Sequence, residues 1–283
     1  RWHKKLGNYW FMKPVFKTAG ASVRGTSHIK NNIPCQDKVY RCAAKNTITI
    51  SLADGAGSCS MSEIGADIST QFVADYLCEN FDKIYTQDSD KTIEILLSSI
   101  KQLLTRKSED LNVSLKEFSS TLLFVSVKNG NYIAGHIGDG LIGCYLDGNP
   151  KVLSFPENGE YSNQTYFTTS ETAKDHLRIY KGELSTINGF ILMSDGSYDS
   201  LFDKSKKKLA LANETFFSWM KDSNNSQQKV EEALSSNLES LFTKATTDDC
   251  SVNLLLISYI DELPWHETLL NKIKGIFSVN DKG

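Results

Sequence analysis

Short acidic side chains stand at the ends of apolar, strand-like runs in several places along this sequence. Each is rooted beside a rigid element, and some have a neighbouring glycine that lets a backbone or a ligand approach closely. The aspartates in such positions are Asp37, Asp54, Asp139, Asp195, Asp248 and Asp249. Carboxylate and carbonyl oxygens are hard ligands, which suit Mg²⁺ or Mn²⁺ better than zinc. The pattern therefore indicates a site for hard divalent cations.

A turn signal is the other interpretation of the same residues. Asp-Gly after a strand is a frequent turn, so each aspartate taken singly has an ordinary structural explanation. The repetition of the pattern in one chain, with no competing cluster of His or Cys, favours the metal site.

Alternating β-branched and aromatic residues predict the strands, and apolar residues at helical spacing predict the helices. The strands are expected at 21–25, 39–43, 47–53, 121–127, 132–137, 141–146, 189–193 and 252–260. The helices are expected at 62–81, 91–111, 209–220 and 227–242. Helices grouped between strands predict an α+β protein, a sheet sandwich flanked by helices.

Tight turns separate the three strands between residues 121 and 146. Residues 128–131 (KNGN) and 138–140 (GDG) are typical of hairpins, so all three strands are expected to be antiparallel neighbours.

Composition narrows the function classes. The 283 residues carry 31 basic and 34 acidic side chains, a formal charge of −3, and no basic stripe, which argues against nucleic acid as a partner. No run approaches the ~18 to 20 apolar residues of a membrane span. The six cysteines form no CxxC pair, so a reducing, cytoplasmic location is expected. Residues 1–11 are interpreted as an N-terminal extension or a cloning remnant, with Met12 a candidate start, and residues 12–283 as one domain.

An ordered set of motifs gives the sequence a family resemblance. The motifs are GTSHIKNNIPCQD (25–37), ADGAGSCSMSEIG (53–65), GDG (138–140), ENGEYSNQTYFTT (157–169), SDGSYD (194–199) and DDCSV (248–252). Together they resemble the metal-dependent protein phosphatases of the 2C class (PP2C, or PPM, family), and most closely its divergent bacterial branch. The resemblance implies a central antiparallel β-sandwich flanked by pairs of helices.

The resemblance also implies roles for individual residues. Asp54 matches the aspartate that bridges two metals, and the carbonyl of Gly55 matches a ligand of the second metal. Asp195 and Asp248 match the other carboxylates of the first metal; Asp248 is preferred because Asp249 falls where the family usually has Asn. The remaining matches are Asp37, at or near the second metal, and Asp139 and Asp199, which join Asp195 at a weaker third metal.

The activity implied is hydrolysis of phosphoserine or phosphothreonine in proteins, opposing a Ser/Thr kinase. Two Mn²⁺ or Mg²⁺ ions ~4 Å apart, with a third in many members, activate a bridging water and clamp the phosphoryl oxygens.

Departures from the family pattern concern the phosphate and the leaving group. Gln36 stands where Glu is common, and Asn32 stands where an arginine often contacts the phosphate; Arg24, His28 or Lys30 are candidate replacements. Ala56 occupies the place of a histidine proposed as general acid in eukaryotic members. His28 or a metal-bound water is then the candidate proton donor, and the alternative for His28 is a hydrogen-bonded loop histidine.

Three features of the sequence allow interpretations other than an active metal-dependent phosphatase. A non-catalytic, phosphoprotein-binding or regulatory relative is the main alternative, and the crowded aspartates argue against it because they would repel one another without metal. Cys35 and Arg41 have the C-x5-R spacing of a cysteine phosphatase, but Asp37 lies between them and would repel a thiolate. Cys59, in a Ser-rich loop, is expected to be exposed, and residues 157–183 are a candidate substrate-gating flap.

Overall fold

Residues 4–5, 8–9, 11–146, 148–157 and 165–262 are the part of the chain that the computed structural model describes. The chain divides into two units, one of residues 1–16 and 257–283 and the other of residues 17–256. In the first unit, β1 (Lys4–Lys5) and β2 (Asn8–Tyr9) pair antiparallel. Strands β3 (Phe11–Val23) and β14 (Cys250–Glu262) each have residues in both units. The expected domain boundary at residue 11 stays a prediction.

Two five-stranded sheets form the centre of the second unit. The first has the order β10-β7-β6-β5-β4, and the second has the order β3-β14-β11-β8-β9. The strands of the first sheet are β4 (Lys38–Ala44), β5 (Thr47–Ala53), β6 (Leu122–Lys128), β7 (Asn131–Ile137) and β10 (Arg178–Glu183). Those of the second, besides β3 and β14, are β8 (Leu141–Leu146), β9 (Asn149–Ser154) and β11 (Ile187–Met193). Neighbouring strands pair antiparallel, as the resemblance implied.

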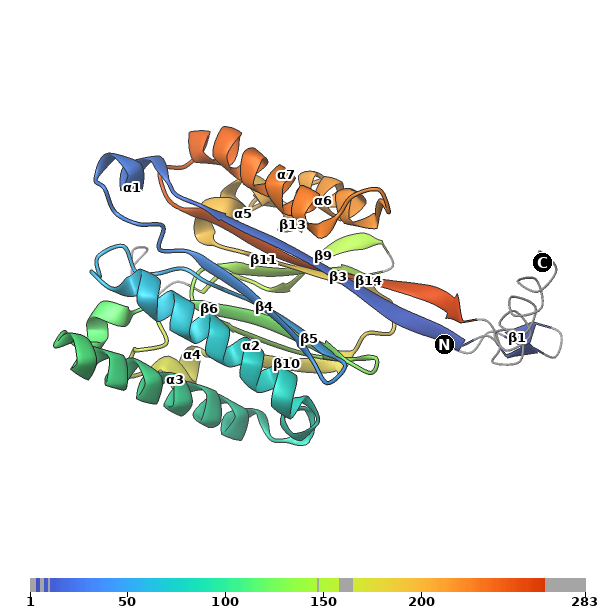
Figure 1. The fold of residues 1–283 in the computed structure, drawn as a ribbon, viewed down its shortest axis with the longest axis horizontal. Helices are drawn as coiled ribbons and strands as arrows, with labels where there is room; N and C mark the ends of the chain where they lie inside the picture. Colours follow the sequence, from blue (N-terminus) through green and yellow to red (C-terminus); the bar gives the residue numbers. More distant parts are fainter. Residues whose placement is uncertain (1–3, 6–7, 10, 147, 158–164, 263–283) are drawn as a thin grey trace, which may run out of the picture. The chain divides into compact units, whose positions relative to one another are not determined.

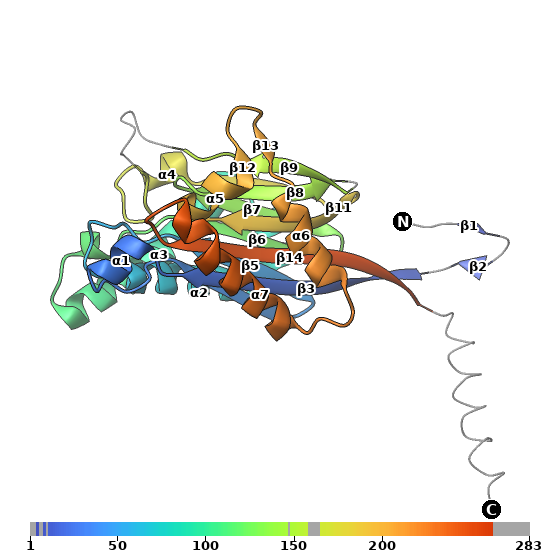
Figure 2. The same cartoon turned by 90° about the horizontal axis from the view of Figure 1, so that it is seen from above.

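Helices cover the outer face of each sheet (Figure 1). The long helices α2 (Ser62–Thr86) and α3 (Ser89–Leu111) lie on the first sheet, and α6 (Ala212–Lys221) and α7 (Gln227–Ser240) lie on the second. Shorter helices are α1 (Thr26–Lys30), α4 (Ala173–His176) and α5 (Asp195–Leu201), with single 3₁₀ turns at Leu115–Phe118 and Phe242–Lys244. The same layers are seen from above in Figure 2. The predicted α+β sandwich is confirmed.

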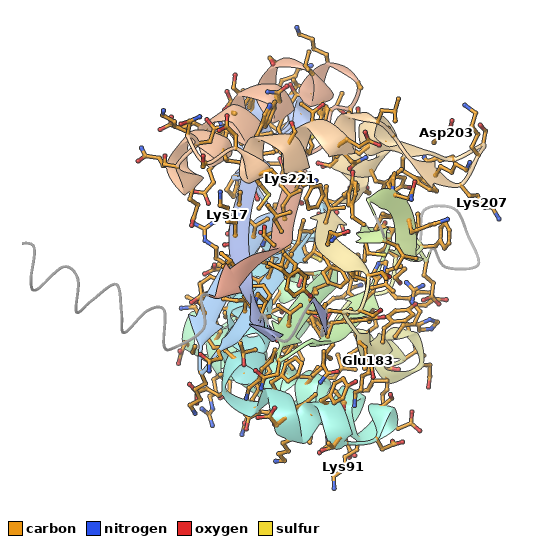
Figure 3. All side chains as sticks on the ribbon, turned by 90° about the vertical axis from the view of Figure 1, so that its right-hand side faces the viewer. Lys17, Lys91, Glu183, Asp203, Lys207 and Lys221 are labelled. Atoms are coloured by element: carbon orange, nitrogen blue, oxygen red, sulfur yellow. The ribbon has the colours of Figure 1, made fainter. Side chains whose placement is uncertain are left out.

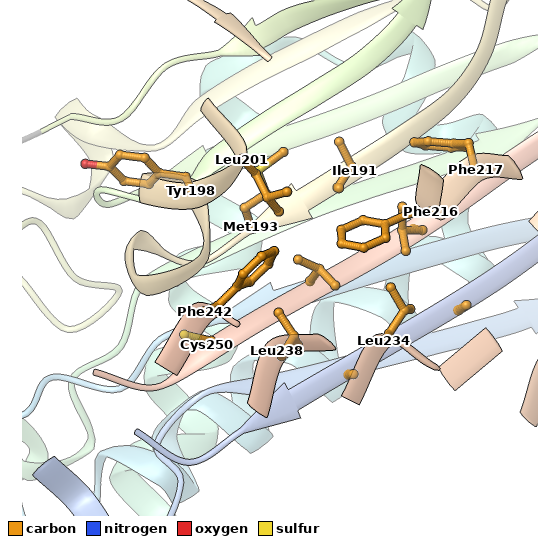
Figure 4. Close-up of a cluster of buried hydrophobic side chains, with 14 of the residues drawn as sticks. Ile191, Met193, Tyr198, Leu201, Phe216, Phe217, Leu234, Leu238, Phe242 and Cys250 are labelled. Carbon is orange, nitrogen blue, oxygen red and sulfur yellow. The ribbon is translucent and has the colours of Figure 1, made fainter. Parts of the chain in front are cut away.

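Each helix layer encloses its own hydrophobic core. Leu77, Leu96 and Ile100 of α2 and α3 are buried against Phe124 of the first sheet. On the other side, Leu234 and Leu238 of α7 and Phe216 of α6 pack towards Ile191 of the second sheet (Figure 4). Burial of these side chains supplies most of the driving force that holds the helices on the sheets.

A polar clamp joins the two sheets. The Asn253 side chain on β14 donates hydrogen bonds to the carbonyls of Tyr40 on β4 and Ser51 on β5, both at 2.9 Å. Tyr132 and Phe190 add a ring contact between the sheets, with centroids 5.4 Å apart. Because a buried amide needs partners, this clamp fixes how β14 crosses the first sheet.

One of the two predicted hairpins is confirmed and the other is wrong. β6 and β7 are joined by a tight turn in which Asn129 and Gly130 both have positive φ. β7 and β8, however, belong to different sheets, so the 138–140 turn carries the chain from one sheet to the other. Gly138 has φ +112°, and its carbonyl accepts a hydrogen bond from Glu157 N rather than from a hairpin partner.

The region 157–183, expected to be irregular, contains helix α4 and the edge strand β10. β10 pairs with β7 over its whole length, although its sequence RIYKGE has little apolar alternation. Residues 158–164 of the predicted flap lie outside the described residues.

A small hairpin of the second unit carries exposed charged side chains. Asp203 and Lys207 lie at the rim of the molecule, on the small hairpin of β12 (Phe202–Asp203) and β13 (Lys208–Leu209) (Figure 3). Residues 204–208 of this hairpin are exposed. Among the described helices, none is long and apolar enough to span a membrane.

Candidate metal centre

A cavity of about 440 Å³ opens where strands of both sheets end. Four of the predicted aspartates line it: Asp54, Asp139, Asp195 and Asp248. Asp54 follows β5 and Asp139 follows β7 of the first sheet, whereas Asp195 follows β11 and Asp248 precedes β14 of the second. The sandwich therefore brings together carboxylates that lie far apart in the sequence.

Short backbone contacts hold these aspartates in place. Asp54 N donates to Thr121 Oγ1 and Asp54 O accepts from Thr121 N, each at 2.8 Å. Asp195 begins α5, where its Oδ1 accepts from Gly196 N at 2.6 Å. Asp248 Oδ1 accepts from the N–H of the next residue at 2.8 Å. The carboxylates are thus rooted on rigid backbone rather than on mobile loops.

The aspartates destabilise one another's charged forms. Burial, followed by the charges of Asp37, Asp195 and Asp139, raises the pKa of Asp54 well above its usual range. Burial, followed by the charges of Asp139 and Asp248, raises the pKa of Asp195 to about 7. Burial also raises the pKa of Asp139, although its hydrogen bond with Thr165 opposes the shift. Such shifts are the mark of carboxylates that lack a nearby positive charge.

The donor chemistry fits a hard divalent cation. The acidic groups facing the cavity offer only carboxylate oxygens, with the backbone of Gly55 also on the wall. Within the described ranges, no group of three or more His, Cys, Asp or Glu side chains is close enough together to form a ready coordination sphere. The predicted ligands therefore line one cavity, but their side chains are not close enough together to coordinate a single ion as they stand.

Asp37 is buried behind the cavity wall rather than on it. Its side chain is 1% exposed, and neither carboxylate oxygen has a hydrogen-bond partner of good geometry among the described residues. Burial and the charge of Asp249 raise the pKa of Asp37 to about 8, although the nearby hydroxyls of Ser194 and Ser251 oppose the shift. An unpaired buried carboxylate is costly, so this group too fits a nearby cation.

The structure does not place Asp199 with the other predicted ligands. It lies one helical turn beyond Asp195 on α5, outside the residues that line the cavity. Its side chain is 51% exposed and forms an ion pair with Lys204 at 2.7 Å. The predicted third-metal set of Asp139, Asp195 and Asp199 is therefore only partly assembled, because a lysine already neutralises Asp199.

Gln36, which stands where the family has Glu, is buried beside the cavity. Its Nε2 donates to the carbonyl of Cys59 at 3.3 Å, and its carbonyl accepts from Gly55 N at 3.2 Å. The side-chain oxygen has no partner among the described residues. This residue thus orients the Gly55 peptide without adding a charge.

Only one of the three candidate phosphate-binding cations reaches the cavity. His28 lines it, on α1. Arg24 is exposed and donates to the carbonyl of Ile33, and Lys30 is exposed at the end of α1. His28 is on a helix rather than in the loop expected for it, and its Nδ1 lies 2.9 Å from Asp249 Oδ1.

Two residues of the site were given no role from the sequence. Thr165 lines the cavity and donates to Asp139 Oδ2 at 2.6 Å. Asp249 is 2% exposed and accepts from the backbone N–H of Gly25 and of Gln36, both at 2.6 Å. The Asp-Asp pair was a visible signal for Asp249, and Thr165 lies inside the motif at 157–169, although nothing in that motif indicated its contact with Asp139.

The cysteine-phosphatase alternative has no support in the structure. Burial, followed by the charges of Asp37 and Asp249, raises the pKa of the Cys35 thiol, which is the opposite of what a nucleophile needs. Arg41 is paired with Glu231 instead of facing the thiol. The expected exposure of Cys59 is also wrong: the residue is 7% exposed, because its loop packs against Ala56 and Gln36.

Comparisons with known proteins agree with this arrangement. The family model described as protein phosphatase 2C matches residues 24–239. Serine/threonine-protein phosphatase 3 of Escherichia coli (strain K12) is 30% identical over 166 residues, which make up 56% of this chain and 65% of the relative. The chain thus spans slightly less than two thirds of that relative's length.

Solved structures share the fold. The S. agalactiae serine/threonine phosphatase matches with a TM-score of 0.58 and 15% identity, covering 86% of this chain and all (100%) of that one. The catalytic domain of the serine/threonine protein phosphatase PstP, solved in complex with two manganese ions, matches with a TM-score of 0.57 and 14% identity, covering 87% and 99%. With the family model spanning most of its length, this chain belongs to the protein phosphatase 2C family.

Proposed function

We propose that this protein is a divalent-metal-dependent serine/threonine protein phosphatase that hydrolyses phosphomonoesters by attack of water. The observation that carries the proposal is the cavity in which Asp54, Asp139, Asp195 and Asp248 meet. Four carboxylates held together on rigid backbone would destabilise the fold if they served no cation. The names of the relatives support the same reaction class.

Two or three Mn²⁺ or Mg²⁺ ions are the proposed cofactors. Asp54, Asp195 and Asp248 would hold the first ion, and Asp54 with the Gly55 carbonyl would hold the second, with Asp37 behind it. The bound manganese of PstP supports this choice of metal. The chemistry that such ions supply is activation of a water and neutralisation of phosphoryl charge.

The chain's own residues prepare the site for this chemistry. The Thr121 contacts fix Asp54, and the Thr165 hydroxyl fixes Asp139. The backbone carbonyl of Gln36 holds the Gly55 peptide, and the neutral side chain of Gln36 brings no further negative charge close to the phosphate. His28 is a polar group on the cavity wall that can meet the substrate.

The proposed substrate class is supported by the names of the relatives. We propose phosphoserine and phosphothreonine in proteins, with a Ser/Thr kinase as the opposing enzyme, in the cytoplasm. The alternative of a non-catalytic relative loses weight because the cavity retains its carboxylates, although Asp199 is paired with a lysine.

Hydrolysis of a phosphothreonine peptide, measured with Mn²⁺ and with EDTA, tests the proposal. We expect turnover that requires Mn²⁺ and that disappears in Asp195→Asn. A matched control is Asp82→Asn, since Asp82 is an exposed aspartate that pairs with Lys128 far from the cavity. If there is no turnover and the melting temperature does not change when Mn²⁺ is added, the protein is better explained as a non-catalytic relative.

A further inference from the structure

The Asp249 carboxylate ties three segments of the chain together behind the cavity. Its Oδ1 accepts from Gly25 N and its Oδ2 accepts from Gln36 N, both at 2.6 Å. A side chain at Gly25 would meet the backbone of Asp248 at 2.3 Å, so the segment before α1 lies directly against residues 248–249. The Asp249 carboxylate is therefore held in a fixed position by these contacts.

The same carboxylate faces His28. Nδ1 of His28 lies 2.9 Å from Oδ1 of Asp249, which is the distance of an ion pair without the angle of a hydrogen bond. Hydrogen bonds of this kind are often poorly aligned in ligand-free enzymes and tighten when substrate binds. Because the two ring nitrogens project in diverging directions, Nε2 points away from Asp249.

The other edge of the His28 ring belongs to the cavity. His28 lines the cavity beside Ser27, Asp54 and Asp248, and Nε2 is the ring nitrogen on the side away from Asp249. Arg24 and Lys30, the other basic side chains of this segment, are exposed and do not line the cavity. His28 is thus the basic side chain that the segment presents to a substrate.

We propose that Asp249 is a positioning residue that aims His28 Nε2 at the ester oxygen of a phosphoserine or phosphothreonine substrate. The inference rests on the proposed phosphatase function and adds two residue roles to it. Asp249 accepts a hydrogen bond from Nδ1–H, which keeps that proton on the ring and leaves the Nε2 proton as the one to be transferred. His28 then acts as the proton donor, and Asp249 acts only through it.

Hydrolysis requires one proton transfer from the His28 ring to the ester oxygen. Water attacks phosphorus, the bond from phosphorus to the ester oxygen breaks, and the electron pair of that bond stays on the ester oxygen. That oxygen takes the proton from Nε2 of the protonated ring, which gives the free alcohol, inorganic phosphate and a neutral His28. A proton from solvent restores the ring before the next turnover.

The dependence on the leaving group tests this assignment. An alkyl ester such as phosphothreonine leaves as a strongly basic oxygen and needs the proton, whereas p-nitrophenyl phosphate releases a stable phenolate and does not. We expect His28→Gln and Asp249→Asn to lower kcat/KM on a phosphothreonine peptide by about 100-fold or more, and on p-nitrophenyl phosphate by less than about 5-fold.

A second His–carboxylate pair provides the matched control. His176 Nδ1 forms a hydrogen bond of 2.8 Å with Glu157 Oε1, a contact of similar length outside the residues that line the cavity. His176→Gln should leave the ratio of the two kcat/KM values unchanged. Equal losses on both substrates in His28→Gln would overturn the proton-donor role, and a wild-type ratio in Asp249→Asn would overturn the positioning role.

A measurement without turnover separates this inference from the proposed function. In the metal-free full chain labelled with ¹⁵N-histidine, His28→Gln identifies the His28 ring signals. We expect Asp249→Asn to shift both ring nitrogens of His28 and to leave those of His176 in place. If the wild type hydrolyses neither substrate, the proposed function fails, and the ring signals still decide whether Asp249 holds His28; unchanged signals would overturn that contact.

Discussion

The cavity and the core beneath α6 and α7 lie in the same unit, but their side chains interact in opposite ways. The cavity gathers side chains that repel one another: burial and like charges raise the pKa of Asp54 far above its usual range. The core gathers side chains that water excludes, such as Leu234 and Phe216, which are almost fully buried (Figure 4). The buried core therefore stabilises the folded state, whereas the crowded carboxylates of the cavity destabilise it.

The largest expected effect comes from neutralising the centre of the cavity. Asp54→Asn should lower kcat/KM on a phosphothreonine peptide at least about 1,000-fold, roughly 4 kcal/mol of transition-state stabilisation. The same change should raise the melting temperature of the metal-free protein, because it removes a carboxyl group whose ionised form is disfavoured by burial and by the neighbouring charges. Steady-state kinetics and a thermal melt in EDTA check the two halves. If Asp54→Asn were both inactive and less stable than the wild type in EDTA, the Asp54 carboxyl would not be a destabilising group in the metal-free protein.

A change in the core should have the reverse signature. Leu234→Ala removes a fully buried side chain from α7 and should cost about 2–5 kcal/mol of unfolding free energy. The kcat/KM of the folded fraction should stay near the wild-type value, because Leu234 does not line the cavity. Urea unfolding followed by circular dichroism, together with active-fraction kinetics, provides the measurement. Loss of activity without loss of stability would show that the two regions are coupled.

Metal should stabilise the protein through the cavity alone. At a Mn²⁺ concentration about 100 times its dissociation constant, binding to the native state should add about 2.7 kcal/mol of unfolding free energy. Leu234→Ala should keep this increment, whereas Asp54→Asn should lose most of it. Thermal melts with Mn²⁺ and with EDTA supply the test. An equal response in all three proteins would mean that the ion binds elsewhere.

The smallest effect concerns a histidine of the scaffold. His136 on β7 is fully buried with its Nδ1 2.8 Å from Ser154 Oγ, and burial, helped by the charge of Arg178, lowers the pKa of His136 well below its usual range. Below about pH 6.5, His136 binds a proton in the unfolded chain but not in the native protein. The free energy of unfolding therefore decreases as the pH falls. The contribution to the slope is about 1.4 kcal/mol per pH unit.

His136→Gln should flatten the loss of stability between pH 6.5 and 5 by about that amount per unit. Urea unfolding at several pH values measures the slope, which is compared between the two proteins rather than the absolute stability. His176→Gln is the control, since His176 is a partly exposed histidine. Parallel slopes in wild type and His136→Gln would show that His136 titrates normally in the native state.

Most elements were predictable because their patterns are local. β5 and β8 have the expected bounds, and α2 and α3 begin within a few residues of where the apolar spacing starts. The turn between β6 and β7 followed from its Asn-Gly pair, since both positions adopt positive φ. β9 and β10 were not foreseen, because edge strands with polar residues carry little periodic signal.

The surroundings of some site residues could not be predicted, because their positions depend on distant partners. Asp139 was expected in a hairpin, yet it lies on a crossover between sheets, a placement that the pairing of β8 with β9 and β11 decides. Asp199 was grouped with the ligands, but its position beside Lys204 depends on the β12–β13 hairpin. Asp248 and Asp249 are neighbours in the chain, and only their opposite surroundings separate a cavity residue from a buried anchor.

By itself, the sequence determined the types of element, the carboxylate chemistry of the site and the family, because these depend on residue types, on local spacing and on the order of motifs. The tertiary structure alone decided which carboxylates face a common cavity and which are buried or paired. It also joined Asp249 to His28 across 221 positions of the chain, by the contact between Nδ1 and Oδ1. This contact depends on the pairing of β3 with β14, two strands far apart in the sequence, and no local pattern encodes that pairing.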